Sequence, residues 1–240
     1  MIRKMQAFDG LVNCRDLGGL TLEQGGLTRT GVLFRSETPQ LMTAADVTRA
    51  REILGIGRVV DLRGRKMLGQ ELGGSGLLGA EGRGVNIDFF ELAGGMQAID
   101  QTPDGFLLHM LDCGGPPLAV FLDHLVTTDA AVLVHCHTGK DRTGFIVAMT
   151  LALVGVTDAE IIADYEMSGP VFEAMMANLE AFGLPVPPEA PAYARHRPSP
   201  EGLIMMLDKL RADWPSPQAW AAEKGIDPAL IEKTRARLVA

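Results

Sequence analysis

One segment constrains the fold more than any other, because an apolar run, a short polar loop and a second apolar run follow one another between residues 130 and 156. Residues 130–134 have the composition of a short buried strand. The apolar stretch over 144–156 is too short to span a bilayer and is typical of a buried helix. A strand that continues through a tight loop into a helix is the unit of parallel sheets. We therefore expect an α/β fold with a central, mainly parallel sheet flanked by helices.

The sequence before this segment supplies further elements of such a fold. Thr43 and Asp46 have the spacing of a capping box, so a helix is expected from there to about Leu54, ended by Gly55. The other predicted elements are strands at 58–62 and 85–90, a Gly-rich loop at 64–84 and a helix at 116–128.

The C-terminal part is predicted to be helical. Residues 183–198 contain many prolines and indicate a loop or linker. Three helix starts follow, each with a capping residue before a proline at the first helical position: Ser199-Pro200, Ser216-Pro217 and Asp227-Pro228. We expect a single domain over residues 1–240, with a core at about 8–182 and appended helices at 199–240.

Charge and cysteine content restrict the class of protein. The net charge of −8 argues against a broad nucleic-acid surface, which is usually basic. The three cysteines form no closely spaced pair, which favours free thiols in a reducing compartment. No apolar run follows the charged N-terminus, so no cleavable signal is expected. We predict a cytoplasmic protein without a transmembrane segment, and export without a cleavable signal stays an alternative.

The polar loop has the composition of an anion-binding site. A loop that closes onto a helix N-terminus turns backbone N–H groups inward and leaves the first helical donors unpaired. Gly139 permits the positive φ that such a loop needs. The positive field favours the thiolate of Cys136, which is the nucleophilic form. Arg142 is placed to hold two oxygens of a phosphate through its planar guanidinium. The full run is His135-Cys136-His137-Thr138-Gly139-Lys140-Asp141-Arg142-Thr143-Gly144.

This run resembles the signature loop of protein tyrosine phosphatases. In its full form it is similar to the loop of the atypical bacterial tyrosine and phosphoinositide phosphatases, and the resemblance covers about residues 8–170. Agreement extends to Asn13-Cys14-Arg15-Asp16-Leu17-Gly18-Gly19, Leu33-Phe34-Arg35-Ser36, Val59-Val60-Asp61-Leu62-Arg63, and Asp164-Tyr165 with Ser168. Cys14 is a departure, since the family usually has phenylalanine there, and we interpret it as a core substitution. Cys14 and Cys113 are expected to be inert.

The resemblance implies a phosphatase that uses no metal or organic cofactor. Cys136 is the expected nucleophile and Arg142 the expected phosphate ligand. The expected substrate-binding residues are His137, Thr138, Gly139, Lys140 and Thr143. The expected supporting residues are His135, Arg15, Asp16, Arg35, Asp61 and Arg63.

Several of these residues have a predicted role with an alternative. Lys140 either contacts additional phosphates or is a solvated surface lysine. Thr143 is expected to donate a hydrogen bond to the sulfur of Cys136, and His135 to be buried and bonded to the loop. A buried ion network that supports the loop is expected from Arg15, Asp16, Arg35 and Arg63, and contact of one of these arginines with substrate is the alternative.

The general acid is the least determined part of the site. The leaving oxygen needs a proton, and a carboxylic acid near the scissile bond usually supplies it. The resemblance assigns this role to Asp141, whose protonated form is disfavoured by Arg142 and favoured by a bound phosphate dianion. The alternative is a structural carboxylate at a helix N-terminus. The reserve candidates are Asp61, Asp100, Asp104 and Asp112.

Other functions fit the residues less well. Adjacent positions on a strand end point to opposite sides, and no second ligand pair has zinc spacing, so a zinc site at His135-Cys136-His137 is disfavoured. A nucleotide-binding loop is disfavoured because Lys140 precedes an aspartate rather than Ser or Thr. A phospho-recognition module without turnover and a sulfur transferase remain alternatives. The expected partners are phosphorylated proteins or phosphoinositides and no nucleic acid, and the oligomeric state and any lid are left open.

Overall fold

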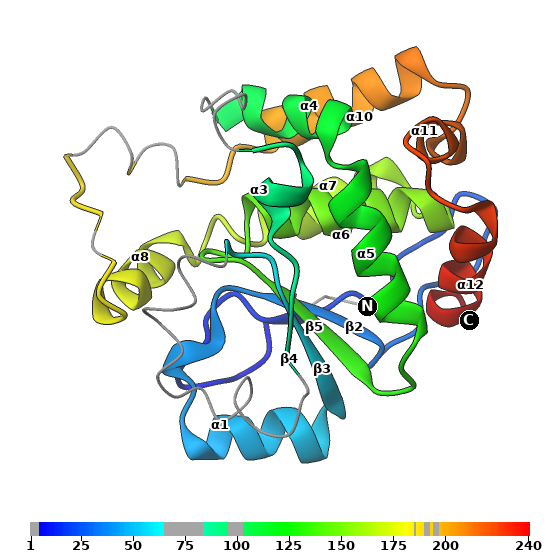
Figure 1. The fold of residues 1–240 in the computed structure, drawn as a ribbon. Coiled ribbons are helices and arrows are strands. Elements are labelled where there is room, and N and C mark those ends of the chain that lie inside the picture. The colour runs from blue at the N-terminus through cyan, green and yellow to red at the C-terminus, as the bar shows by residue number, and fades with distance from the viewer. Residues whose placement is uncertain (1–4, 65–83, 96–102, 185, 190–192, 194–196) are drawn as a thin grey trace.

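The computed structural model describes residues 5–64, 84–95, 103–184, 186–189, 193 and 197–240 (Figure 1). Within these residues five strands form one sheet in the order β1-β2-β5-β3-β4. Their bounds are β1 Arg15–Asp16, β2 Leu33–Ser36, β3 Ile56–Asp61, β4 Gly84–Asn86 and β5 Ala131–His135. All neighbouring strands are parallel except β1, which runs antiparallel to β2. The predicted α/β fold with a mainly parallel sheet is confirmed.

Helices cover both faces of this sheet (Figure 1). The short segments on the α1 side are the 3-10 turn η1 Pro39–Leu41, α1 Ala44–Thr48 and the π-helical turn η2 Arg49–Ile53. The longer helices on and around the other side are α4 Pro103–Cys113, α5 Gly115–Val126, α6 Asp141–Val154 and α7 Asp158–Glu166. The remaining helices are α3 Phe89–Leu92, α8 Phe172–Ala181, α10 Pro200–Asp213, α11 Pro217–Glu223 and α12 Pro228–Leu238.

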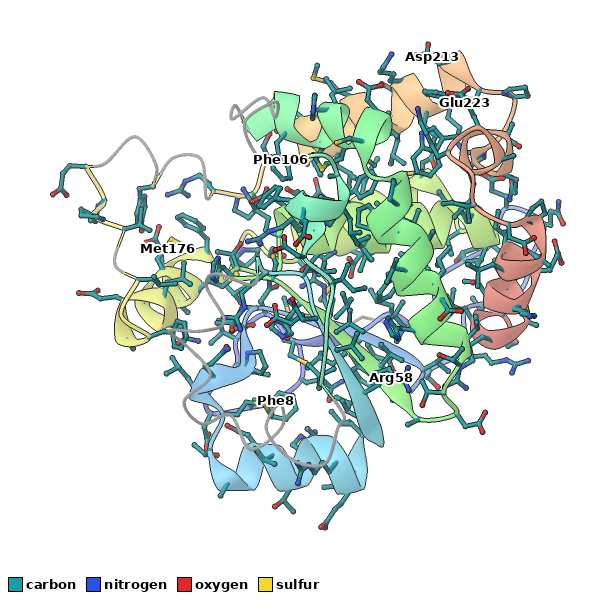
Figure 2. All side chains as sticks on the ribbon, in the orientation of Figure 1. Phe8, Arg58, Phe106, Met176, Asp213 and Glu223 are labelled. Atoms are coloured by element: carbon teal, nitrogen blue, oxygen red, sulfur yellow. The ribbon has the colours of Figure 1, made fainter. Side chains whose placement is uncertain are left out.

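The alternation of side chains along the strands creates two hydrophobic clusters. Val132 and Val134 of β5 pack with residues of α5 and α6 in the larger cluster. Leu133, between them, faces the opposite side and packs with Phe34 and Val59 toward α1. Phe8 lies between α1 and the sheet on this second side (Figure 2). The central strand is therefore buried on both faces, as its unbroken apolar sequence predicts.

The predicted helix from Thr43 to Leu54 is confirmed. The Thr43 hydroxyl accepts from Asp46 N and the Asp46 carboxylate accepts from Thr43 N, which completes the capping box. The chain leaves the helix at Gly55, whose φ is +68°. The second half of this helix winds as a π-helical turn, which the sequence did not indicate.

The strand predicted at 85–90 is only partly right, because β4 ends at Asn86. Asp88 then caps α3 by accepting from Glu91 N, so Phe89 and Phe90 are helical although their composition suits a strand. The Gly-rich loop predicted at 64–84 lies outside the described residues apart from its two end positions, of which Gly84 opens β4.

The three helices predicted from the Ser-Pro and Asp-Pro pairs are confirmed as α10, α11 and α12. Ser216 and Asp227 cap their helices through the side chain. Trp220 of α11 is fully buried in the larger cluster and donates from Nε1 to Leu111 O at 3.0 Å. The three helices thus contribute to the same core as the sheet, while the domain boundaries given above stay a prediction.

Helix length and hydropathy bear on membrane crossing. In the part of the chain that the structure describes, no helix taken singly is long and apolar enough to cross a bilayer. Only the bent pair Gly105–Cys113 and Gly115–Val126, with 76° between its halves, passes the same length and composition test when counted together.

Candidate active site

Three parallel strands deliver the predicted site residues to one edge of the sheet. Ser36 of β2 and Asp61 of β3 both pair with His135, the last residue of β5. The segments that follow these strands therefore leave the sheet side by side, at its carboxyl edge, where α/β proteins bind ligands. Cys136 comes directly after β5 and has only 2% of its surface exposed.

Donors outside the loop hold the carbonyl oxygens of the loop after Cys136. The bonds are Thr38 N to His137 O at 2.8 Å, Asn13 Nδ2 to Thr138 O at 3.0 Å and Arg35 Nη2 to Gly139 O at 2.7 Å. In a trans peptide the N–H points away from the preceding C=O. The amides of Thr138, Gly139 and Lys140 are therefore turned away from these donors, to the inner side of the loop. Three such amides at the start of a helix form an anion-binding cradle.

Gly139 has no substitute in this loop. Its φ is +69°, a region that L-residues with a side chain rarely adopt. A Cβ at this position would lie 2.2 Å from Ser36 O. The loop and the end of β2 can approach this closely only because residue 139 has no side chain.

Arg142, on the first turn of α6, is half-buried and lies against three groups. Its Nη1 donates to Leu62 O at 3.2 Å, its Nη2 lies 3.3 Å from His137 Nδ1, and its Cζ lies 5.0 Å from the centre of the Phe90 ring. Burial and then the Arg142 guanidinium lower the pKa of His137 to about 3, so His137 is neutral and its Nδ1 is available as an acceptor. Phe90 was not among the predicted site residues.

Lys140 is buried rather than solvated. Only 1% of its side chain is exposed, and Nζ lies 3.0 Å from Asp141 Oδ1. Nζ also donates to Arg197 O at 3.2 Å. The interpretation of Lys140 as a surface lysine is therefore wrong. Asp141, the first residue of α6, keeps 29% of its side chain exposed beside this ammonium group.

The predicted hydrogen bond from Thr143 to the sulfur of Cys136 is not formed. Within the described part of the chain the buried Thr143 Oγ1 has no hydrogen-bond partner. A threonine hydroxyl on a helix usually donates to a carbonyl three or four residues earlier. Thr150 of the same helix does so, from Oγ1 to Ile146 O at 2.7 Å, whereas the hydroxyl of Thr143 makes no such bond within the described residues.

The predicted single ion network is in fact two separate groups. In the first, Arg15 and Arg35 share the carboxylate of Asp164, at 2.8 Å and 2.6 Å. Asp16 belongs to neither group, since its carboxylate accepts from the backbone N–H of Gly18 and Gly31. The reason is strand geometry: successive side chains of β1 point to opposite faces, so Arg15 and Asp16 cannot lie in one cluster.

The second group joins Asp61, Arg63 and His135. Arg63 donates to Asp61 Oδ2 from Nε at 3.0 Å and from Nη2 at 2.7 Å. His135 is fully buried, with Nδ1 3.0 Å from Cys136 O and Nε2 3.9 Å from Asp61 Oδ2. Burial opposes ionisation of Asp61, but His135 and Arg63 outweigh it and lower the pKa of this carboxyl. Asp61 is therefore poorly suited to donate a proton.

Among the other reserve acids, the structure describes the side chain of Asp112 only. Asp112 is exposed and lines a surface hollow with Cys113 and Lys224. Asp104 lies in α4, but its side chain is not among those described, and Asp100 lies outside the described residues. Of the candidate acids whose side chains are described, Asp141 is the one that is both partly exposed and next to the loop.

Comparison with known proteins assigns the family. The model of the tyrosine phosphatase family matches residues 6–240. The chain belongs to the tyrosine phosphatase family. The match continues through α10, α11 and α12, further than the resemblance over about residues 8–170 that the motifs indicated.

Relatives of the family match parts of the chain. A protein of Cupriavidus necator, provisionally named as a tyrosine-protein phosphatase, is 35% identical over 175 residues, 66% of this chain and 61% of the relative. A tyrosine-protein phosphatase of Nostoc commune is 30% identical over 46% of this chain and 40% of its own length. The triple specificity protein phosphatase PtpB of Mycobacterium tuberculosis is 32% identical over 49% and 48%. The chain thus spans between two-fifths and about three-fifths of these relatives.

Among solved structures, the core catalytic domain of the PP-IP phosphatase SIW14 of S. cerevisiae, in complex with citrate, matches 69% of this chain and 78% of its own. The sequence identity is 14% and the TM-score is 0.38.

Three residues that contact the loop after β5 or the side chains holding it were not among the predicted site residues: Asn13, Phe90 and Asp164. The sequence contains a signal for Asp164. It is one residue before Tyr165 and three after Ile161, so it falls on the buried stripe of α7. A carboxylate on the apolar side of a helix needs a buried cation, which predicts partners such as Arg15 and Arg35.

Among the described residues, no three His, Cys, Asp or Glu side chains come together in a way that would hold a metal ion.

Proposed function

We propose that this chain is a cysteine-dependent phosphatase that hydrolyses phosphomonoesters through a cysteinyl-phosphate at Cys136. The observation that carries the proposal is the loop between β5 and α6, whose carbonyls are bonded to outside donors so that its amides face inward. Inward amides at a helix N-terminus bind a tetrahedral oxyanion and favour a thiolate at the start of the loop.

In the first step the thiolate of Cys136 attacks phosphorus and an S–P bond forms as the P–O bond to the leaving group breaks. The loop amides and Arg142 hold the three equatorial oxygens, where negative charge is spread in the transition state. In the structure Arg142 contacts two neutral acceptors, Leu62 O and His137 Nδ1. Replacing them with phosphate oxygens gives charge-assisted bonds, which are about twice as strong.

The leaving oxygen takes a proton, for which we propose Asp141. Its carboxyl is partly exposed at the first turn of α6, two residues after Gly139 of the loop. In the second step water attacks the phospho-cysteine, the same carboxylate accepts a proton from that water, and phosphate and the thiolate are released.

The proposed substrates are phosphotyrosine in proteins, with phosphoserine, phosphothreonine and phosphoinositides as further candidates. The names of the relatives, tyrosine-protein phosphatase and triple specificity protein phosphatase, support a protein substrate. Phosphoinositides rest on the sequence resemblance, because Lys140 is buried and paired with Asp141 and is therefore not positioned to contact a further phosphate. A panel of phosphopeptides and phosphoinositides on one preparation distinguishes these classes.

Hydrolysis of p-nitrophenyl phosphate by Cys136→Ser tests the mechanism. We expect turnover to fall below a few per cent of the wild-type rate while vanadate still binds, because the cradle is made of amides and Arg142. Cys113→Ser, which changes a partly exposed thiol elsewhere, is the matched control and should keep full activity. Residual turnover above a few per cent in Cys136→Ser would place the nucleophile elsewhere. Wild-type protein that binds vanadate without turnover would instead be a recognition module.

A further inference from the structure

The buried group behind the loop does more than hold the fold together. We propose that Asp164 of α7 is a positioning residue for the phosphate loop: it fixes the two side chains that hold Thr138 O and Gly139 O away from the phosphate. The proposal rests on the phosphatase function proposed above. Asp164 acts through Arg35 on one side and through Arg15 and Asn13 on the other.

The first connection is direct. Asp164 Oδ2 accepts from Arg35 Nη1 at 2.6 Å, and the other terminal nitrogen of the same guanidinium, Nη2, donates to Gly139 O at 2.7 Å. The guanidinium is planar, so the position of one nitrogen sets the position of the other. The carboxylate therefore determines where the donor to Gly139 O lies.

The second connection passes through an amide. Arg15 donates from Nε to Asp164 Oδ1 at 2.8 Å and from Nη1 to Asn13 Oδ1 at 2.5 Å. Ser168 Oγ also donates to Asn13 Oδ1, at 3.1 Å. With two donors on its oxygen, the Asn13 amide can present only its nitrogen to the loop, and Nδ2 donates to Thr138 O at 3.0 Å.

Burial makes these bonds hard to replace. Asn13 and Arg15 are fully buried, and Arg35 and Asp164 are each 1% exposed, so water does not reach the carbonyls when a donor is lost. Two guanidinium groups share the one carboxylate. Burial and then Arg15 already lower the pKa of Arg35 to about 10. Without the negative charge of Asp164, the guanidinium groups of Arg15 and Arg35 repel one another. We expect both donors to the loop to move as a result, Arg35 directly and Asn13 through Arg15.

The consequence for catalysis follows from peptide geometry. Releasing Thr138 O and Gly139 O allows the amides of Gly139 and Lys140 to rotate out of the cradle. Both amides would bind equatorial phosphate oxygens and not the leaving oxygen. The effect should therefore be the same for good and poor leaving groups, and it should extend to vanadate and to the thiolate of Cys136.

The test uses Asp164→Asn, which removes the charge, and Arg35→Lys, which keeps a cation but cannot reach Asp164 and Gly139 O together. Removal of one oxyanion donor usually costs about 10²–10³ in kcat. We expect kcat for p-nitrophenyl phosphate to fall about 10²-fold in both variants, and the vanadate inhibition constant to rise about 10-fold. The pH midpoint for alkylation of Cys136, followed by mass spectrometry of its peptide, should move upward.

Asp46→Asn is the matched control. Asp46 is also a buried carboxylate, but it accepts from the N–H groups of Asp9, Gly10 and Thr43 on the α1 side of the sheet. This variant should be less stable than the wild type. Its vanadate inhibition constant should stay within two-fold of the wild-type value, and its pH midpoint for alkylation of Cys136 should be unchanged within experimental error.

A vanadate constant and alkylation midpoint unchanged in a folded Asp164→Asn protein would overturn the proposal. If that variant does not fold, Arg35→Lys decides by the same two readouts. A loss of kcat that depends on the leaving group would also overturn it. Absence of p-nitrophenyl phosphate hydrolysis by the wild type is a separate result, since it contradicts the phosphatase function itself.

Discussion

Replacing Gly139 with alanine tests the geometry of the loop directly. The added Cβ would lie 2.2 Å from Ser36 O, and about 1 Å of movement is needed to restore an ordinary contact. The substitution also carries the backbone cost of a side chain at φ +69°, about 1–2 kcal/mol. A displacement of about 1 Å in a catalytic site can cost about 10²-fold in rate, equivalent to about 2.7 kcal/mol. We therefore expect kcat/KM for p-nitrophenyl phosphate to fall by about that factor.

Gly55→Ala separates the backbone cost of a side chain at positive φ from the cost of the contact with Ser36. Gly55 has nearly the same φ, +68°, but a Cβ there would meet no atom within 4 Å. This control should lose about 1–2 kcal/mol of stability in urea denaturation and keep its activity. Gly139→Ala should lose at least as much stability and the activity as well. If Gly139→Ala keeps more than half of the wild-type kcat/KM, the loop does not depend on the close approach to Ser36 and the reasoning is wrong.

Three further predictions concern acid, pH and metal. Asp141→Asn should lower hydrolysis of phosphoserine by about 10²–10⁴-fold and of p-nitrophenyl phosphate far less, because nitrophenolate leaves without a proton; an equal loss would make Asp141 structural. Because the pKa of His137 is about 3 when folded and about 6.5 when unfolded, only the unfolded chain takes up this proton as pH falls through that range. His137 alone should thus remove about 1.4 kcal/mol of the free energy of unfolding per pH unit between about pH 6.5 and pH 3, and His137→Gln should remove this contribution from the slope measured in urea titrations. EDTA should leave the rate unchanged, because the proposed nucleophile is a thiolate rather than a metal-bound water; activity lost to EDTA and restored by zinc would contradict this.

Local patterns were sufficient for much of the fold. The apolar run at 130–134 became the central strand β5, and the capping box at Thr43 began the first helix where expected. The loop after β5 could be recognised because its chemistry is contiguous: Cys136, Gly139 and Arg142 lie within seven residues. Contacts of this kind are fixed by the loop itself and by the helix that follows.

The remainder depends on contacts between distant segments. Lys140 is polar and loop-borne, and its burial results from Asp141 and from the carbonyl of Arg197, 57 residues away. The buried stripe of α7 indicates that Asp164 needs a cation, but which arginines pair with Asp164 and which with Asp61 depends on the register of β1 and on how α7 packs against the sheet. Phe90 was assigned to a strand, so its ring was not considered as a neighbour of Arg142.

The position of β5 in the sheet has a consequence during synthesis. β2 and β3 have no bond to each other, since each pairs with β5, which lies between them. β3 ends at Asp61 and β5 begins at Ala131, so at a ribosomal rate of about 5–20 residues per second β2 and β3 are both complete for roughly 4–14 s before their common partner begins. During that time their inner edges present unpaired backbone groups, which favour association with other nascent chains. We expect the yield of native protein to depend more strongly on chaperones and temperature than the stability of the folded protein does. The catalytic loop should form only after β5 has paired with β2 and β3.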